Sequence, residues 1–219
     1  MAIATMGDLR AEVAAECMRT NHRGFSESWN RMLSFAENRI YDGGGRPFPT
    51  PPVRVTEMEF TADPLTFTAG AATVPTDFLE LRSFIYTNDL SSQLKYEPPG
   101  TFRLNRSTQS TGYPNKYTIE GDKVLISPLI TGDLVFNYYA RPANMTSDDD
   151  SNAVLARYPN LYFQACLIEA YGYTRDDARR QVAMGDFTSV VNGLMEADIR
   201  KKTGGTNLYP RIRNSTVRC

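Results

Sequence analysis

The sequence predicts an α+β protein, with helices near both ends of the chain and a β segment between them. Apolar residues recur every three or four positions at both ends, a period typical of amphipathic helices. Residues 53–141 instead contain short β-branched and aromatic runs separated by Gly, Pro, Asn and Asp, which indicates strands. We therefore expect a four-helix bundle-like body with an inserted antiparallel β domain and an extended C-terminal arm.

The N-terminal region predicts two helices. The first is expected over Thr5–Arg19, and Thr5 and Asp8 have the spacing of a capping box, in which side chains bind free amide groups at the helix start. The second is expected over Phe25–Tyr41, and its apolar stripe includes Trp29. A run of glycines followed by closely spaced prolines then predicts an extended, non-helical segment.

The central segment predicts strands, a hairpin and a loop. The expected strands are Val53–Phe60, Leu65–Phe67, Leu81–Tyr86, Lys116–Glu120, Lys123–Ser127 and Leu134–Ala140. Gly121 and Asp122 are expected to form a tight turn between two of them. The polar stretch Glu97–Asn115 is expected to be a long loop, and loops of this length are usually functional or mobile.

Helical periodicity returns after an acidic linker at Thr146–Ser151. A third helix is expected to begin at Pro159, and apolar residues around most of its circumference predict that it is central and buried. A fourth helix is expected from Thr174 or Asp176 to Lys202. The predicted division is N-terminal helices at 1–46, a β domain at 47–145, C-terminal helices at 146–202 and an arm at 203–219.

The sequence carries little that indicates catalysis or cofactor binding. The single histidine, His22, lies between two expected helices without a serine-nucleophile motif, so an ordinary loop role is favoured. A calcium loop beginning at Asp148 would need glycine at its sixth position and glutamate at its twelfth, where Ala153 and Pro159 stand. Gly43–Gly45 lacks the Lys-Ser/Thr that follows in a phosphate-binding loop. We expect a protein that is not an enzyme, with no cofactor and no metal.

Overall charge and apolar content exclude other partner classes. The 24 basic and 25 acidic residues nearly cancel, so the whole chain has no general attraction to nucleic acid or anionic lipid. No stretch approaches the roughly 20 apolar residues that span a bilayer, so we expect no membrane partner. The three widely spaced cysteines do not fit a disulfide framework or a zinc site.

Positive charge is concentrated at the C-terminus, where the last twenty positions hold six basic residues and no acidic one. Two interpretations remain, a disordered solvated tail or an arm that orders on an acidic partner surface. In the second interpretation, three apolar side chains anchor the arm and three arginines pair with carboxylates. These residues are Leu208, Tyr209, Arg211, Ile212, Arg213 and Arg218.

Several stretches together resemble a known family. They are Phe35–Ile40, Val74–Arg82, Leu94–Glu97, Gly112–Asp122, Phe136–Arg141 and Asn152–Ala170, the last with Tyr158-Pro159-Asn160-Leu161-Tyr162 near its middle. No single stretch is specific, but their order and spacing are. In these features the chain resembles the bacteriophage head-to-tail adaptors, also called head-tail connectors or tail tubular protein A-like proteins.

The resemblance implies a structural virion protein of the head-tail neck, made in the bacterial host cytoplasm. It implies a ring of about twelve copies, which is a closed cyclic assembly, between the portal protein and a tail or nozzle protein. DNA would pass through the lumen without sequence-specific binding. We expect the C-terminal arm to bind the portal. We expect exposed residues of the Glu97–Asn115 stretch, namely Phe102, Arg103 and Arg106, to lie at a tail or subunit interface.

Two other functions fit the sequence less well. One alternative is a tail-associated protein that binds or hydrolyses glycans. Hydrolysis would need two carboxylates at a suitable separation, and no such pair is evident. A sequence-specific DNA-binding protein would need a basic recognition face, whereas the residues before position 200 carry a net negative charge.

Overall fold

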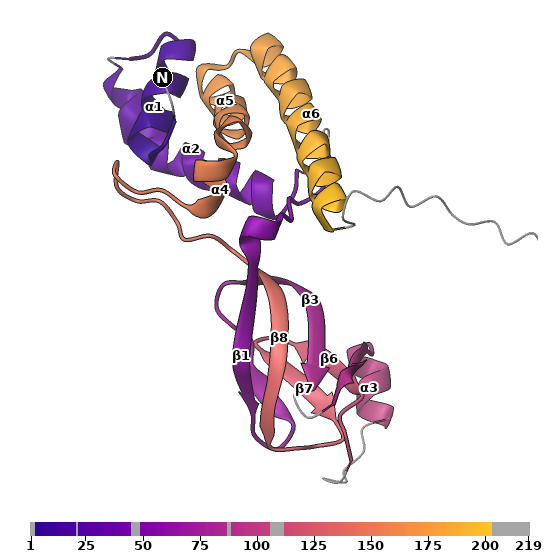
Figure 1. The fold of residues 1–219 in the computed structure, drawn as a ribbon. Helices are drawn as coiled ribbons and strands as arrows, with labels where there is room; N and C mark the ends of the chain where they lie inside the picture. The colour runs from indigo at the N-terminus through magenta and orange to yellow at the C-terminus, as the bar shows by residue number, and fades with distance from the viewer. Residues whose placement is uncertain (1–2, 21, 45–48, 87–88, 106–111, 203–219) are drawn as a thin grey trace, which may run out of the picture. The chain divides into compact units, whose positions relative to one another are not determined.

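The computed structural model describes residues 3–20, 22–44, 49–86, 89–105 and 112–202. The chain divides into two compact units (Figure 1). The β unit comprises residues 1–8 and 57–157, and the helical unit comprises residues 9–56 and 158–219. The presence of both helices and sheets confirms the mixed α+β class.

The helical unit is built around a buried helix. Its long helices are α1 (Met6–Glu16), whose first residues belong to the β unit, α2 (Arg23–Tyr41), α5 (Pro159–Thr174) and α6 (Asp177–Lys202). Helix α5 packs against both α2 and α6, and half of its residues are buried, among them Leu161 and Ile168. The prediction that this helix is buried is confirmed.

Local capping explains where these helices begin and end. The predicted capping box is confirmed, because the Asp8 amide donates to Thr5 Oγ1 and the Thr5 amide donates to Asp8 Oδ2, both at 3.2 Å. Helix α1 ends earlier than the predicted Arg19, since Met18 adopts a left-handed conformation with φ +54°. The Arg19 amide then bonds the Ala14 carbonyl and the Met18 amide bonds the Ala15 carbonyl, a closing arrangement that glycine usually provides.

The β unit contains two four-stranded sheets. The first has the order β1 (Glu59–Phe67), β8 (Gly132–Ala140), β3 (Phe78–Tyr86) and β4 (Asp89–Gln93), with every pair antiparallel. The second has the order β2 (Ala71–Thr73), β7 (Lys123–Ser127), β6 (Lys116–Glu120) and β5 (Lys95–Tyr96). The hairpin prediction is confirmed, because Glu120 pairs with Lys123 and Gly121 has φ +60°.

One hydrophobic core joins the two sheets. Phe84 of β3 and Phe136 of β8 pack edge to face with ring centres 5.2 Å apart, and Val124 and Ile126 of β7 belong to the same cluster. All four side chains are at most 2% exposed. Each buried side chain of this size contributes on the order of 1.5–3 kcal/mol, so this cluster fixes the sheets against each other.

The structure departs from the prediction at several points between residues 53 and 157, and strands β2, β4 and β5 were not predicted. Val53–Phe60 and Leu65–Phe67 were expected as separate strands, but the single strand β1 covers Glu59–Phe67, and the short 3₁₀ helix η1 (Thr56–Met58) precedes it. The expected loop Glu97–Asn115 contains the helix α3 (Pro99–Asn105), and the short helix α4 (Ala153–Arg157) was not predicted. Strand β5 runs parallel to β6, so the inserted β domain is not wholly antiparallel.

Candidate interaction surfaces

The described residues include no metal-binding group and no reactive thiol. Among them, no three His, Cys, Asp or Glu side chains lie close enough together to bind a metal ion. His22 caps α2, and its Nδ1 accepts a hydrogen bond from the Phe25 amide at 3.1 Å. Burial raises the pKa of the Cys17 thiol to about 11 and that of Cys166 well above its usual value. Both thiols therefore stay protonated at neutral pH and are poor nucleophiles.

Helix α3 presents a charged outer side and a buried inner side. Arg103 forms two hydrogen bonds to Glu120 of β6, at 3.1 and 2.5 Å, although its own side chain is 72% exposed. Phe102 is fully buried beside it, so the expectation that Phe102 is exposed was wrong. In a helix, neighbouring residues point in different directions, which puts Phe102 inside and Arg103 outside. Arg106 lies outside the described residues.

Glu97 connects the end of α3 to the start of β6. Its Oε1 accepts hydrogen bonds from Asn105 at the end of α3 and from Lys116 at the start of β6. These hydrogen bonds, first that from Asn105, lower the pKa of Glu97. The carboxylate therefore stays ionised at neutral pH and holds α3 against the second sheet.

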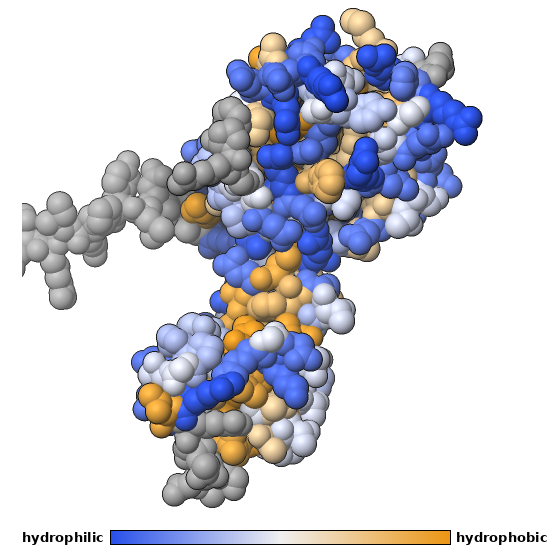
Figure 2. Space-filling view, turned by 180° about the vertical axis from the view of Figure 1, so that it is seen from behind, coloured by the Kyte–Doolittle hydropathy of each residue, from blue (hydrophilic) through white to orange (hydrophobic). Residues whose placement is uncertain are grey.

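Exposed apolar and aromatic side chains accompany this charged surface. Leu104 on α3 is 88% exposed, Tyr113 is 64% exposed and Tyr96 of β5 is 55% exposed. Tyr113 packs against Tyr86 of β3 with ring centres 5.5 Å apart and ring planes tilted by 51°. Figure 2 also shows hydrophobic side chains gathered over a visible face of the β unit, whereas the visible face of the helical unit is mainly hydrophilic. Tyrosine is enriched in protein interfaces, so the β unit carries a candidate contact surface.

The C-terminal end of α6 is anchored within the helical unit. The Thr56 amide and hydroxyl donate to Asp198 Oδ1 at 2.9 and 2.6 Å, and Lys202 Nζ lies 2.5 Å from Asp198 Oδ2. Burial acts to raise the pKa of Asp198, but the hydrogen bonds from Lys202 and Thr56 outweigh it and the pKa is lowered. The starting point of the C-terminal arm is thereby fixed.

The predicted portal-binding residues themselves lie outside the described part of the chain. They are Leu208, Tyr209, Arg211, Ile212, Arg213 and Arg218. Of the basic residues near the end of the chain, Arg200, Lys201 and Lys202 are described. Arg200 and Lys202 each have an acidic partner one turn earlier on α6, Glu196 and Asp198, and Lys201 Nζ donates to the Tyr158 hydroxyl at 3.4 Å. Basic residues at this end of a helix also interact favourably with its dipole.

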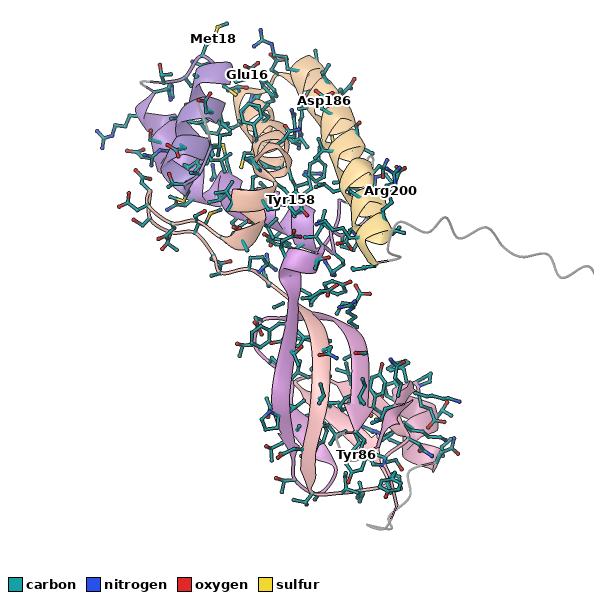
Figure 3. The ribbon with its side chains drawn as sticks, in the orientation of Figure 1. Glu16, Met18, Tyr86, Tyr158, Asp186 and Arg200 are labelled. Atoms are coloured by element: carbon teal, nitrogen blue, oxygen red, sulfur yellow. The ribbon has the colours of Figure 1, made fainter. Side chains whose placement is uncertain are left out.

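A groove in the helical unit was not predicted from the sequence. It has a volume of about 620 Å³ and lies between the end of α1, one side of α5 and the first turns of α6. Met18, Phe163, Leu167 and Val182 give it an apolar lining. In Figure 3, Glu16 and Met18 lie at the end of α1 and Asp186 lies on α6. Its lining combines the end of α1 with the consecutive helices α5 and α6 in the C-terminal part of the chain, so no local pattern could have indicated it.

Within the described ranges, no helix is both long enough and apolar enough to cross a membrane. The sequence model of a family described as SU10 adaptor protein matches residues 4–211 of the chain. This match includes residues of both units and residues 203–211 of the C-terminal arm. A search of curated proteins gave no match.

Proposed function

Because the chain belongs to the SU10 adaptor protein family, a family of phage head-to-tail adaptors, we propose that it forms a ring between the portal and the tail of a phage. The family match over residues 4–211 is the observation that carries this proposal. The ring has about twelve copies in a closed cyclic arrangement. It sits in the neck of the virion and completes the channel through which DNA passes.

The division into two units supports a role that requires two partners. Each unit has its own buried core, with Trp29 and Phe187 in the helical unit and Phe84 and Phe136 in the β unit. Each can therefore offer a stable surface to a different protein. In this proposal α1, α2, α5 and α6 form one bundle-like body, and the β unit is the domain inserted into it.

The β unit provides the tail or subunit contact. Arg103 can also contact an acidic partner, because its side chain is 72% exposed even though it pairs with Glu120. Leu104, the next residue on α3, and Tyr113 add exposed apolar area to the β unit. Arg106 lies two positions after Leu104 in the sequence. Phe102 contributes indirectly, since its burial fixes the orientation of α3.

The C-terminal arm provides the portal contact. It begins after Lys202, whose position is fixed by Asp198, and Gly204 and Gly205 allow it to leave the helix in several directions. Its arginines form forked hydrogen bonds with portal carboxylates, and Leu208, Tyr209 and Ile212 are buried in the complex. DNA in the lumen contributes only sequence-independent, salt-sensitive attraction to these arginines.

A deletion of the encoding gene tests the proposal in the phage. Without the chain, infected cells should accumulate DNA-filled heads that lack tails, and a plasmid copy should restore tailed particles. A plasmid copy that ends at Lys202 should fail to restore them. Tailed, infectious particles at normal yield from the deletion phage would contradict the adaptor role.

A further inference from the structure

The α1/α5/α6 groove has features of a binding surface that lacks its ligand. Met18 and Val182 are apolar yet 80% and 65% exposed. The backbone of Met18 has a left-handed conformation that residues other than glycine rarely adopt. The groove is therefore an apolar site that remains open to solvent in the described part of the chain.

Polar groups around the groove indicate what it would bind. Glu16 and Asp186 are exposed, and neither has an ion-pair partner among the described residues. Gln164 Oε1 is buried in the groove lining without a hydrogen-bond donor within the same part of the chain. A fitting ligand would bring apolar side chains, positive charge and hydrogen-bond donors, because a buried acceptor without a donor is unfavourable.

Residues 203–219 of the chain have this composition. They contain Leu208, Tyr209 and Ile212 together with arginines and no acidic residue. Arg179 also lines the groove, but it lies 3.5 Å from Asp176, which offsets its charge. The acidic edge of the groove and the basic arm are therefore complementary in charge, and the apolar side chains of both need burial.

The length of the arm also fits. Asp186 and Lys202 lie on the same straight helix, and a rise of 1.5 Å per residue separates them by about 24 Å. An extended chain advances about 3.3–3.6 Å per residue, so about seven residues cover this distance. Counted from the end of a reversal at Gly204 and Gly205, seven residues would bring Ile212 to the level of Asp186. Gly204 and Gly205 supply the reversal of direction that the return requires.

We propose that, in the free subunit, the C-terminal arm folds back along α6 and occupies the α1/α5/α6 groove of its own chain. Arg211 and Arg213 pair with Glu16 and Asp186, and Tyr209 and Ile212 cover Met18 and Val182. The groove then holds the arm residues that the proposed function assigns to portal binding. In a free subunit these residues stay covered until another protein surface displaces the arm from the groove. The fold-back concerns the isolated chain and does not depend on the portal contact.

Disulfide trapping in the purified full chain tests this inference. Val182→Cys and Ile212→Cys are introduced together with Cys219→Ser; Cys17 and Cys166 stay, since both are buried. The matched control pairs Ile212→Cys with Phe35→Cys, because Phe35 is an exposed residue of the same unit that does not line the groove. Under mild oxidation, the groove pair should cross-link within one chain about tenfold faster than the control, as expected for a raised effective concentration.

Charge reversal distinguishes the proposed contact from chance encounter. Asp186→Arg should slow cross-linking of the groove pair, and Arg211→Asp with Arg213→Asp should restore it in that background. Unchanged thermal unfolding of each variant checks that the fold is intact. Equal rates for the groove and control pairs would overturn the proposal. Cross-linked dimers without cross-linked monomers would also overturn it, since they would assign the groove to the arm of a second copy.

Discussion

The hydroxyl groups of Tyr41 and Tyr162 lie 2.5 Å apart inside the helical unit and join the end of α2 to the start of α5. The two residues are 121 positions apart in the sequence, and both are at most 1% exposed. Their hydrogen bond therefore links the two parts of the chain that flank the inserted β segment. A buried hydroxyl that loses a hydrogen bond costs about 1–3 kcal/mol.

A double-mutant cycle should detect this link. Tyr41→Phe and Tyr162→Phe should each lower the free energy of unfolding by about 1–2 kcal/mol, because each leaves one buried hydroxyl with a lost hydrogen bond. The double variant should lose less than the sum of the two single losses, because the second change removes a hydroxyl that has already lost this bond. Urea denaturation measures all three values. Strictly additive losses would mean that the two hydroxyls do not interact.

Trp29 should be among the most important side chains for the stability of the helical unit. It is 1% exposed on α2, so Trp29→Ala should lower the free energy of unfolding by about 3–5 kcal/mol. Phe35→Ala on the same helix is the control, because Phe35 is 53% exposed and its loss should change stability by no more than about 0.5 kcal/mol. Similar unfolding midpoints for the two variants would contradict the assignment of Trp29 to the core.

Asp198 should make stability depend on pH in the acid range. Its pKa in the folded protein is lowered below the usual 3.8, so its stabilising effect is complete above that value. The effect is lost as the pH falls through the lower folded-state pKa, because protonation weakens the bonds from Lys202 and Thr56. Asp198→Asn should therefore cost about 1–3 kcal/mol at pH 7 and much less near pH 2.

The control for this change is Glu196→Gln on the same helix, where the side chain is 71% exposed. It should change stability by at most about 0.5 kcal/mol at either pH. A loss for Asp198→Asn that is equal at pH 7 and pH 2 would show that the carboxylate charge is not what anchors the end of α6.

Elements with a clear hydrophobic period could be predicted from the sequence, whereas elements defined by tertiary contacts could not. Helices α2, α5 and α6 and strands β6 and β7 follow the sequence pattern closely. Helix α3 was missed because Pro98, Pro99 and Gly100 are typical of a loop, although proline is well tolerated in a first helical turn. Its stability comes from burying Phe102 and from the Arg103–Glu120 contact, neither of which a local pattern can indicate.

Substitutions on the surface of α3 should affect partner binding without affecting the stability of the β unit. Leu104→Glu should leave the free energy of unfolding within about 0.5 kcal/mol of the parent, because the side chain is 88% exposed. It should nevertheless reduce the yield of tailed particles if α3 contacts the tail or a neighbouring subunit. Phe102→Ala should instead destabilise the protein by about 3–5 kcal/mol. A normal particle yield from the stable Leu104→Glu variant would exclude Leu104 from the contact.

Candidate surfaces were harder to predict than the fold for a physical reason. The sequence placed Phe102 and Arg103 together as exposed residues because both lie in a polar stretch, but helix geometry separates them. The α1/α5/α6 groove is lined by Met18 together with Phe163 and Val182, and Met18 is remote in the chain from the other two. A surface of this kind depends on which helix faces become neighbours, and hydrophobic periodicity does not specify that.

The central claim is that this chain forms the ring that joins the portal to the tail. Electron microscopy of purified portal rings, free of DNA, mixed with the full chain tests it most directly, with the chain that ends at Lys202 as the matched control. The proposal predicts an added ring layer of about twelve copies on one face of the portal, and loss of that layer with the shortened chain. Portal rings that stay bare at saturating concentrations of the folded full chain would contradict the claim.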